Sequence, residues 1–366
     1  MKRSLKEFTK NSWPIIEPSR DFYDNWHIDA ISEHLQAVVH GDIKRLIINV
    51  PPRHMKSISV AVALPAWTWT VDPTRKFLFA SYALTLSIRD SVKCRRLIDS
   101  PWYKQHFGNI YGLTTDQNQK QRFENDKTGI RIATSVDGAL TGEGGDIIVI
   151  DDPHNVREAE SNTVRQGVLD WWDQSMQTRL NDPKNGAFVI IMQRVHENDL
   201  TGHILANEYE DWDHLCLPAR YEHDHPTPVK STLAFEDPRE EDGELLWPER
   251  IDERTLNTLE QSLGSYASAG QLQQRPMPKG GGILKLSGGN HGKNQTCQTL
   301  NMCCSPMTQL FLQKRKHHIL PEPLGEFLGC MDKSMLLFLR CGMTELHIPN
   351  FVNLHKKHIM IMNQTQ

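Results

Sequence analysis

The sequence predicts an α/β fold with a mainly parallel sheet that helices cover on both faces. Short β-branched and apolar runs, each typical of a buried strand, alternate along the chain with longer segments of helical periodicity. Strands that alternate with helices favour parallel pairing, because the crossover between two parallel strands places a helix on a face of the sheet.

The first half of the chain alternates in this way. Apolar residues at helical spacing between Asp29 and Val39 predict a helix that Gly41 ends. Residues 103–128 are polar and predict a peripheral excursion. The predicted strands are 45–50, 76–81 and 130–134, and the further predicted helices are 58–69 and one marked by Leu84, Ile88, Val92 and Leu97.

The second half adds two buried strands, at 146–150 and 187–192, around an amphipathic helix at 163–180. In parallel sheets, ligands bind beyond the carboxyl ends of the strands. Polar residues that follow three of the predicted strands should therefore share one edge of the sheet, and they are Lys56-Ser57, Asp151-Asp152 and Gln193-Arg194.

Composition sets further limits. The chain has 366 residues with a 38% hydrophobic share, enough for a sizeable core, and its net charge of −4 gives no overall basic signature for nucleic acid. Neither a membrane-length apolar run nor a signal-peptide core is found, which favours a cytoplasmic location without membrane contact. The predicted domains are 1–214 as a core, 215–284 as a subdomain and linker, and 285–366 as an atypical tail.

A phosphate loop is predicted between the strand at 45–50 and the following helix. The usual pattern is Gly-x-x-x-x-Gly-Lys-Ser/Thr, but here Pro51 or Pro52 and Met55 occupy the region of the glycines. The context of strand, short loop, Lys-Ser and helix favours a nucleotide site, with backbone N–H groups around phosphate oxygens. The predicted nucleotide-binding residues are Arg53, His54, Met55, Lys56 and Ser57. The alternative is a proline turn followed by an ordinary exposed lysine.

The acidic pair strengthens this prediction. Asp151 would supply a hard oxygen ligand to Mg²⁺ together with Ser57, and Asp152 would orient the attacking water. Gln193 could sense the γ-phosphate, and Arg194 could bind phosphate. The alternatives are a helix N-cap at Asp151-Asp152 and an ordinary polar turn after the next strand.

The histidines show no metal-ligand spacing with matching cysteines. His27 and His196 are therefore predicted to be structural residues with satisfied hydrogen bonds.

The ordered set of motifs resembles tailed-phage terminase large subunits, the DNA-packaging motors. The match covers about residues 20–284, and the stretches that carry it are 25–27, 46–57, 81–84, 141–146, 150–153, 192–202 and 271–276. The resemblance implies an additional-strand P-loop NTPase fold that uses ATP and Mg²⁺. It assigns Lys56 and Ser57 to the phosphate loop, Asp151 to Mg²⁺, Asp152 to the catalytic acid position and Gln193 to the coupling motif.

The same resemblance implies double-stranded DNA, a portal protein and a terminase small subunit as partners, a homo-oligomeric ring, and action in the cytoplasm of a host bacterium. We therefore expect an ATP-hydrolysing packaging motor. The alternative is a degenerate prophage relic that binds nucleotide or partners without turnover. A helicase-like translocase is a third reading, which the ordered motifs disfavour.

The family's second domain, a nuclease with clustered aspartates, has no counterpart pattern in this sequence. After residue 285 cysteine, methionine and histidine increase and acidic residues become sparse. A frameshifted tail without nuclease activity is the leading hypothesis. The alternatives are a divergent genuine domain and a cysteine zinc site.

Overall fold

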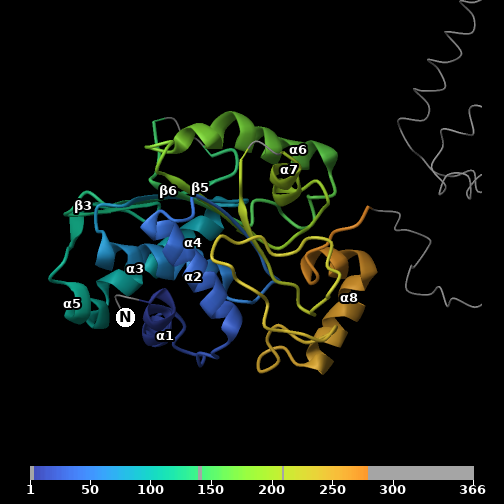
Figure 1. Cartoon of the computed structure of the whole chain (residues 1–366). Helices are drawn as coiled ribbons and strands as arrows, with labels where there is room; N and C mark the ends of the chain where they lie inside the picture. The colour runs from blue at the N-terminus through green and yellow to red at the C-terminus, as the bar shows by residue number, and fades with distance from the viewer. Residues whose placement is uncertain (1–3, 139–141, 208–209, 279–366) are drawn as a thin grey trace, which may run out of the picture. The chain divides into compact units, whose positions relative to one another are not determined.

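The computed structural model describes residues 4–138, 142–207 and 210–278, which lie within one compact unit (Figure 1). The predictions for residues 285–366, including the frameshift and the zinc site, fall outside the described residues. Within the described ranges, no helix combines the length and the apolar character that crossing a membrane requires.

An eight-stranded sheet forms the centre of this unit, in the order β3-β4-β5-β2-β6-β7-β1-β8. All pairings from β5 to β8 in this order are parallel. The β3–β4 and β4–β5 pairings at one edge are antiparallel. The predicted mainly parallel sheet is therefore confirmed. The strands are β1 Arg45–Asn49, β2 Lys76–Ser81, β3 Leu113–Asn118, β4 Arg122–Asn125, β5 Ile130–Ser135, β6 Ile147–Asp151, β7 Ala187–Met192 and β8 Asp213–Cys216.

The position of β7 defines the type of fold. β7 lies between β1, which leads into the predicted phosphate loop, and β6, which carries the acidic pair. Its Ile190 is in register with Ile47 of β1 on one side and with Ile150 of β6 on the other. An extra strand inserted between these two strands is the feature that names the additional-strand P-loop NTPases, so this fold class is confirmed.

Helices cover both faces of the sheet, as predicted (Figure 1). Alternate residues of each central strand point to opposite faces, so Ile48 packs into one apolar cluster and Ile47 into the other. One face carries α1 Leu5–Ile16, α2 Trp26–His40, α3 Leu64–Val71, α4 Leu84–Asp99 and α5 Pro101–Phe107, and the other carries α6 Asn162–Trp171 and α7 Leu200–Ala206. A further helix, α8 Glu253–Gln271, precedes the end of the described chain.

Three predicted helices differ in detail from the structure. The helix expected at 163–180 is α-helical only to Trp171, in α6, and continues as the π-helical segment Trp172–Met176 and the 3-10 turn Gln177–Arg179. The helix expected at 58–69 begins as the π-helical segment Ile58–Ala63 and continues as α3. In α4 the most buried positions include Ser91 and Cys94 rather than Ile88 and Val92. Arg131 of β5, itself fully buried, lies against Cys94 on this face of the helix.

Two segments outside the predicted strands also join the sheet. The excursion predicted at 103–128 contains α5, β3 and β4, so it is an extension of the sheet edge. The short strand β8 crosses the predicted boundary between residues 214 and 215 and pairs with β1.

The C-cap of α2 offers a test of local backbone strain. Gly41 has a φ of +88°, a conformation that costs an L-residue about 1 kcal/mol or more. We expect Gly41→Ala to lower the free energy of unfolding by about that amount in urea titrations. Gly167, inside α6 with open space around it, is the matched control. Gly167→Ala should instead raise stability by roughly 0.5–1 kcal/mol, and equal effects of the two variants would contradict this account.

Candidate nucleotide site

A cavity of about 680 Å³ lies beyond the carboxyl ends of β1 and β6. The phosphate loop and the acidic pair both contribute to its wall. Its charged lining residues are Glu17, Arg20, Arg53, Lys56, Arg89, Asp90, Lys93, Asp151, Asp152, Arg157 and Arg250. The predicted residues Met55, Ser57 and Gln193 also line it.

The phosphate loop keeps a left-handed backbone without its glycines. Met55, at the place of the glycine before the lysine, has a φ of +65°, and Arg53 has a φ of +70°. The cost of that conformation is offset by burial, because the Met55 side chain packs in an apolar cluster with Trp13, Ile28 and Trp247. The glycine pattern of phosphate loops therefore does not identify this loop, whose conformation depends on the apolar cluster around Met55.

Lys56 connects the loop to the acidic pair. Its Nζ lies 2.6 Å from Oδ1 of Asp152, and its side chain is 8% exposed. The alternative of an ordinary exposed lysine is therefore wrong. The same Asp152 oxygen accepts the backbone N–H of Gln193 at 3.3 Å. Residues from β1, β6 and β7 thus meet at one point, as the sequence predicted.

Asp151 has the chemistry of a cation ligand. It is the last residue of β6, and one carboxylate oxygen is buried without a hydrogen-bond partner among the described residues. Burial, followed by the neighbouring charge of Asp152, raises the pKa of Asp151 to about 7, although Lys56 and a hydrogen bond with Ser57 oppose this shift. A divalent cation would remove this cost.

The donor set suits a small hard cation. Asp151 and the Ser57 hydroxyl offer oxygen ligands, which Mg²⁺ prefers. The described residues hold no cluster of three or more His, Cys, Asp or Glu side chains arranged for a metal ion. A cation here would therefore complete its shell with phosphate oxygens and water, which is the usual arrangement for Mg²⁺.

Asp90 is a cavity residue that sequence reasoning missed. It lies on α4, is buried, and accepts hydrogen bonds from the Arg89 guanidinium at 2.9 Å. Its charge contributes to the raised pKa of Asp151. No motif surrounds Asp90, because only the packing of helix α4 in the folded chain brings it to the site.

His54 belongs to the loop, but its ring does not line the cavity. The ring is buried, and its Nδ1–H donates to the carbonyl of Pro52 at 3.0 Å. Burial lowers the pKa of His54 to about 4. Only the backbone of His54 is therefore placed to contact a ligand in the cavity.

The prediction that His27 is a satisfied structural histidine is wrong. The ring is fully buried, and neither nitrogen has a hydrogen-bond partner in the described part of the chain. Its neighbours are the rings of Trp247 and His54, with centroids 4.7 and 5.7 Å away. Burial in these surroundings lowers its pKa well below the ordinary value, so the ring is neutral.

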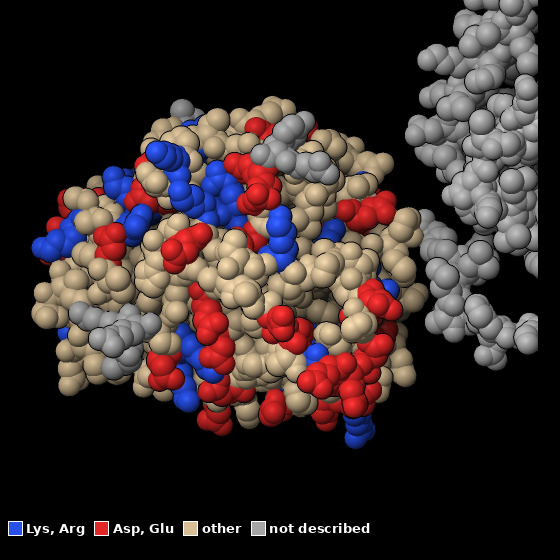
Figure 2. Space-filling model, viewed as in Figure 1, with Lys and Arg blue, Asp and Glu red and all other residues tan. Residues whose placement is uncertain are grey.

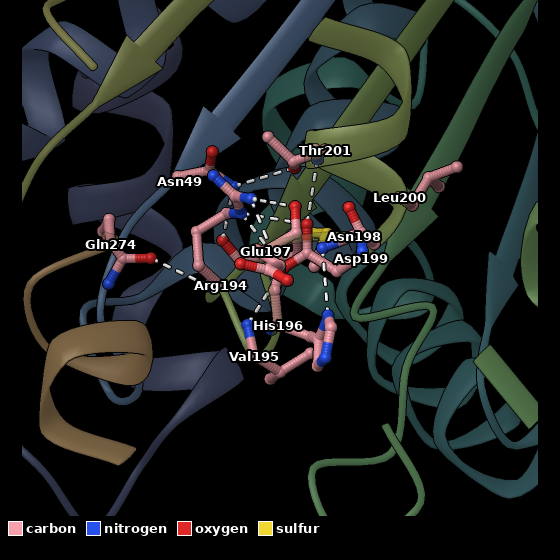
Figure 3. A network of polar contacts seen from close by, with 12 residues as sticks. Asn49, Arg194, Val195, His196, Glu197, Asn198, Asp199, Leu200, Thr201 and Gln274 are labelled. Carbon is pink, nitrogen blue, oxygen red and sulfur yellow. Dashed lines mark hydrogen bonds and ion pairs between the residues drawn. The ribbon is translucent and has the colours of Figure 1, made fainter. Parts of the chain in front are cut away.

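Arg194 points away from the cavity into a buried polar network (Figure 3). Its Nε donates to Asp199 at 2.9 Å, and both side chains are nearly inaccessible. Asp199 also accepts backbone N–H groups, from Val195 at 3.0 Å and from Gly202 at 3.0 Å. The prediction that Arg194 could bind phosphate is therefore wrong, and its role is structural.

This network gives a stability prediction. We expect Asp199→Ala to lower the free energy of unfolding by roughly 3–5 kcal/mol, because Arg194 is left as a buried unpaired charge. Asp211→Ala is the control, since Asp211 is fully exposed and pairs only with the exposed Lys230. That variant should remain within about 0.5 kcal/mol of the wild type. Urea unfolding measures both, and similar stability of the two variants would contradict the prediction.

The fold and the convergence of loop, lysine and acidic pair define a P-loop NTPase architecture. The chain is similar to the crystal structure of the HK97 bacteriophage large terminase, with 11% identity, a TM-score of 0.39, and coverage of 62% of this chain and 46% of that one. It is also similar to the large terminase of a thermophilic bacteriophage, in a complex with ADP and in a second crystal form. Identity is 8% and the TM-score 0.39 for each. The match to the ADP complex covers 65% of this chain and 51% of that one, and the match to the other crystal form covers 73% and 53%.

The chain thus spans about half the length of these terminases. No protein-family model and no curated protein matches the chain. A function for this chain is therefore inferred from the residues of the cavity.

Proposed function

We propose that this chain binds and hydrolyses ATP as the motor subunit of a phage DNA-packaging terminase. The observation that supports ATP chemistry best is the meeting of Lys56 and Ser57 with Asp151 and Asp152 in one cavity, from strands that β7 separates. The ordered motifs that resemble the terminase large subunits support the step from an ATPase to a packaging motor.

In this proposal each of the predicted site residues has one role. Backbone N–H groups of residues 53–57 and the Lys56 ammonium bind the phosphate chain. Ser57 and Asp151 would hold Mg²⁺, which when bound would neutralise phosphate charge. Asp152 orients the attacking water, and Gln193, adjacent to Asp152 through its backbone N–H, responds to the γ-phosphate.

The Lys56–Asp152 ion pair suggests how nucleotide binding prepares the site. The lysine holds the carboxylate of Asp152 at 2.6 Å. When Lys56 turns to phosphate oxygens, Asp152 loses this partner and can accept a hydrogen bond from water. Substrate binding would thus release the residue that activates the nucleophile.

The proposed assembly follows the family resemblance. A homo-oligomeric ring would act on double-stranded DNA with a portal protein and a small subunit, in the cytoplasm of the host bacterium. On the face shown in Figure 2, acidic side chains gather at the lower right, over α8, and basic side chains in the upper half. DNA contact would therefore use local basic surface, since the net charge is −4.

In domain terms, the proposed ATPase core of residues 1–214 extends to Cys216, because β8 belongs to its sheet. Residues 215–284 would supply the rest of the subdomain and linker, and residues 285–366 a tail without nuclease activity.

Turnover by the purified full chain tests the proposal. We measure phosphate release from ATP with Mg²⁺, with excess EDTA, and with added duplex DNA. Mg²⁺-dependent release supports the motor. ATP binding without release in any of these conditions would favour the degenerate relic, and the absence of both binding and release would overturn the nucleotide site.

A further inference from the structure

We propose that Arg250, together with Arg20, binds the phosphate chain of the nucleotide beside the phosphate loop, and thereby attaches the segment 217–252 to the bound nucleotide. This inference rests on the proposed ATP function. It adds a contact that neither the phosphate loop nor the acidic pair provides.

The two arginines reach the cavity from outside the central strands. Arg20 lies in the turn that follows α1, and Arg250 lies in a turn just before α8. Both line the same cavity as Lys56 and Ser57, together with Arg53 of the loop. A ligand on the phosphate loop would therefore share the cavity with these guanidinium groups.

Arg20, Arg53 and Arg250 differ in their pairing from three of the four other cavity cations, the fourth being the exposed Arg157. Lys56 pairs with Asp152, Arg89 with Asp90, and Lys93 with Glu17. Among the described residues, by contrast, no carboxylate forms an ion pair with Arg20, Arg53 or Arg250. The cavity therefore presents unpaired positive charge where a polyanion would enter.

The unpaired charges also act on one another. Burial, and then the charges of Arg20 and Arg53, lower the pKa of Arg250 below its ordinary value, although Glu17 partly opposes this shift. Arg250 is therefore close enough to both Arg20 and Arg53 to be repelled by them, and an anion bound at Arg250 would offset this repulsion. Planar guanidinium groups bind two phosphate oxygens at once, which makes phosphate the anion that fits best.

The position of Arg250 is fixed in advance. Its guanidinium lies 5.1 Å from the ring centroid of Trp247, in a cation–π contact. Trp247 is 1% exposed and packs in the cluster that holds Met55 of the phosphate loop. Because one buried tryptophan supports both the loop and the arginine, little ordering is needed when phosphate binds.

Affinity measurements on the full chain test this proposal, using Arg250→Gln, Arg250→Lys and Arg20→Gln. Calorimetric titration with ATP should show affinity weakened about tenfold or more for Arg250→Gln, as for one lost charge-assisted hydrogen bond. Arg250→Lys should fall between this variant and the wild type, because ammonium cannot form the bidentate contact. Arg20→Gln should also weaken ATP binding.

Arg254→Gln is the matched control, since Arg254 is exposed, lies four residues further on, and does not line the cavity. It should bind ATP as the wild type does. Without nucleotide, the Tm of Arg250→Gln should stay close to that of the wild type, because the variant loses the repulsion from Arg20 and Arg53 together with the cation–π contact to Trp247. A large fall in Tm combined with unchanged ATP affinity would indicate a merely structural role and overturn the proposal.

Protection of the segment 217–252 is the second readout. In the wild type, ATP should slow amide hydrogen exchange in this segment, and Arg250→Gln should abolish that effect at saturating ATP. Equal ATP affinity and equal protection in the two proteins would overturn this inference alone. If Arg250→Gln weakens only the binding of a short DNA duplex, the arginines serve DNA and the inference also fails. If the wild type binds no ATP, the proposed function itself fails.

Discussion

Lys56→Ala is expected to reduce ATP turnover by roughly 1000-fold, the loss that removal of a main electrostatic contact to the transition state produces. Lys56 is the buried cation at the phosphate loop, and its Nζ already lies at the acidic pair. The remaining Asp152 is 27% exposed and can be solvated, so the variant should fold. Phosphate release under saturating ATP and Mg²⁺ measures the effect.

Lys104→Ala is the control for this substitution. Lys104 is 60% exposed, pairs with the exposed Asp99, and does not line the cavity. Its loss should leave turnover at the wild-type rate. Turnover of Lys56→Ala within a few-fold of the wild type would exclude this lysine from the phosphate site, even if the cavity binds ATP.

Asp151→Asn should abolish Mg²⁺-dependent turnover and yet stabilise the nucleotide-free protein at alkaline pH. Burial and Asp152 raise the pKa of Asp151 to about 7 from its ordinary value of 3.8. The folded state thus holds the proton more tightly than the unfolded state does. The wild type accordingly loses stability as pH rises from about 4 to 7 and keeps that deficit above pH 7.

An asparagine has no proton to lose, so the variant escapes this deficit. Near pH 4 the Tm of Asp151→Asn should match that of the wild type, apart from the effect of replacing a carboxyl group by an amide of the same shape. At pH 8 the Tm of the variant should exceed that of the wild type by several degrees. Added Mg²⁺ and ATP should raise the Tm of the wild type only. Asp211→Asn, a change at a fully exposed carboxylate, should show no such pH dependence. A Tm difference that stays constant from pH 4 to pH 8 would contradict the raised pKa.

The sequence predicted the central strands almost to the residue, because long β-branched runs such as that of β7 occur where a strand is buried on both faces. It missed β3, which is mostly exposed, and β4, in which polar residues flank the buried Phe123, because neither contains such a run. It also missed β8, because Asp213 and His214 are buried through tertiary contacts that a four-residue segment cannot reveal.

The candidate site divides in the same way. Lys56, Asp151 and Gln193 could be predicted because each follows a strand, and parallel strands end at the same edge. Asp90 and Arg250 could not, since only packing brings helix α4 and the turn before α8 to the cavity. Arg194 also follows a strand but does not line the cavity. Its guanidinium donates to Asp199, five residues later, and so is not available to a ligand.

The bond between Arg194 and Gln274 has a mechanical consequence. The peptide N–H of Arg194, the residue after Gln193, donates to the side-chain oxygen of Gln274 at 3.0 Å (Figure 3). Gln274 in turn lies where the chain leaves α8 toward its C-terminal part. Any displacement of the backbone at Gln193 during a catalytic cycle must therefore move this exit point or break the bond. If the cavity hydrolyses ATP as proposed, a backbone movement at Gln193 would reach Gln274 through a side-chain amide and without deforming the sheet.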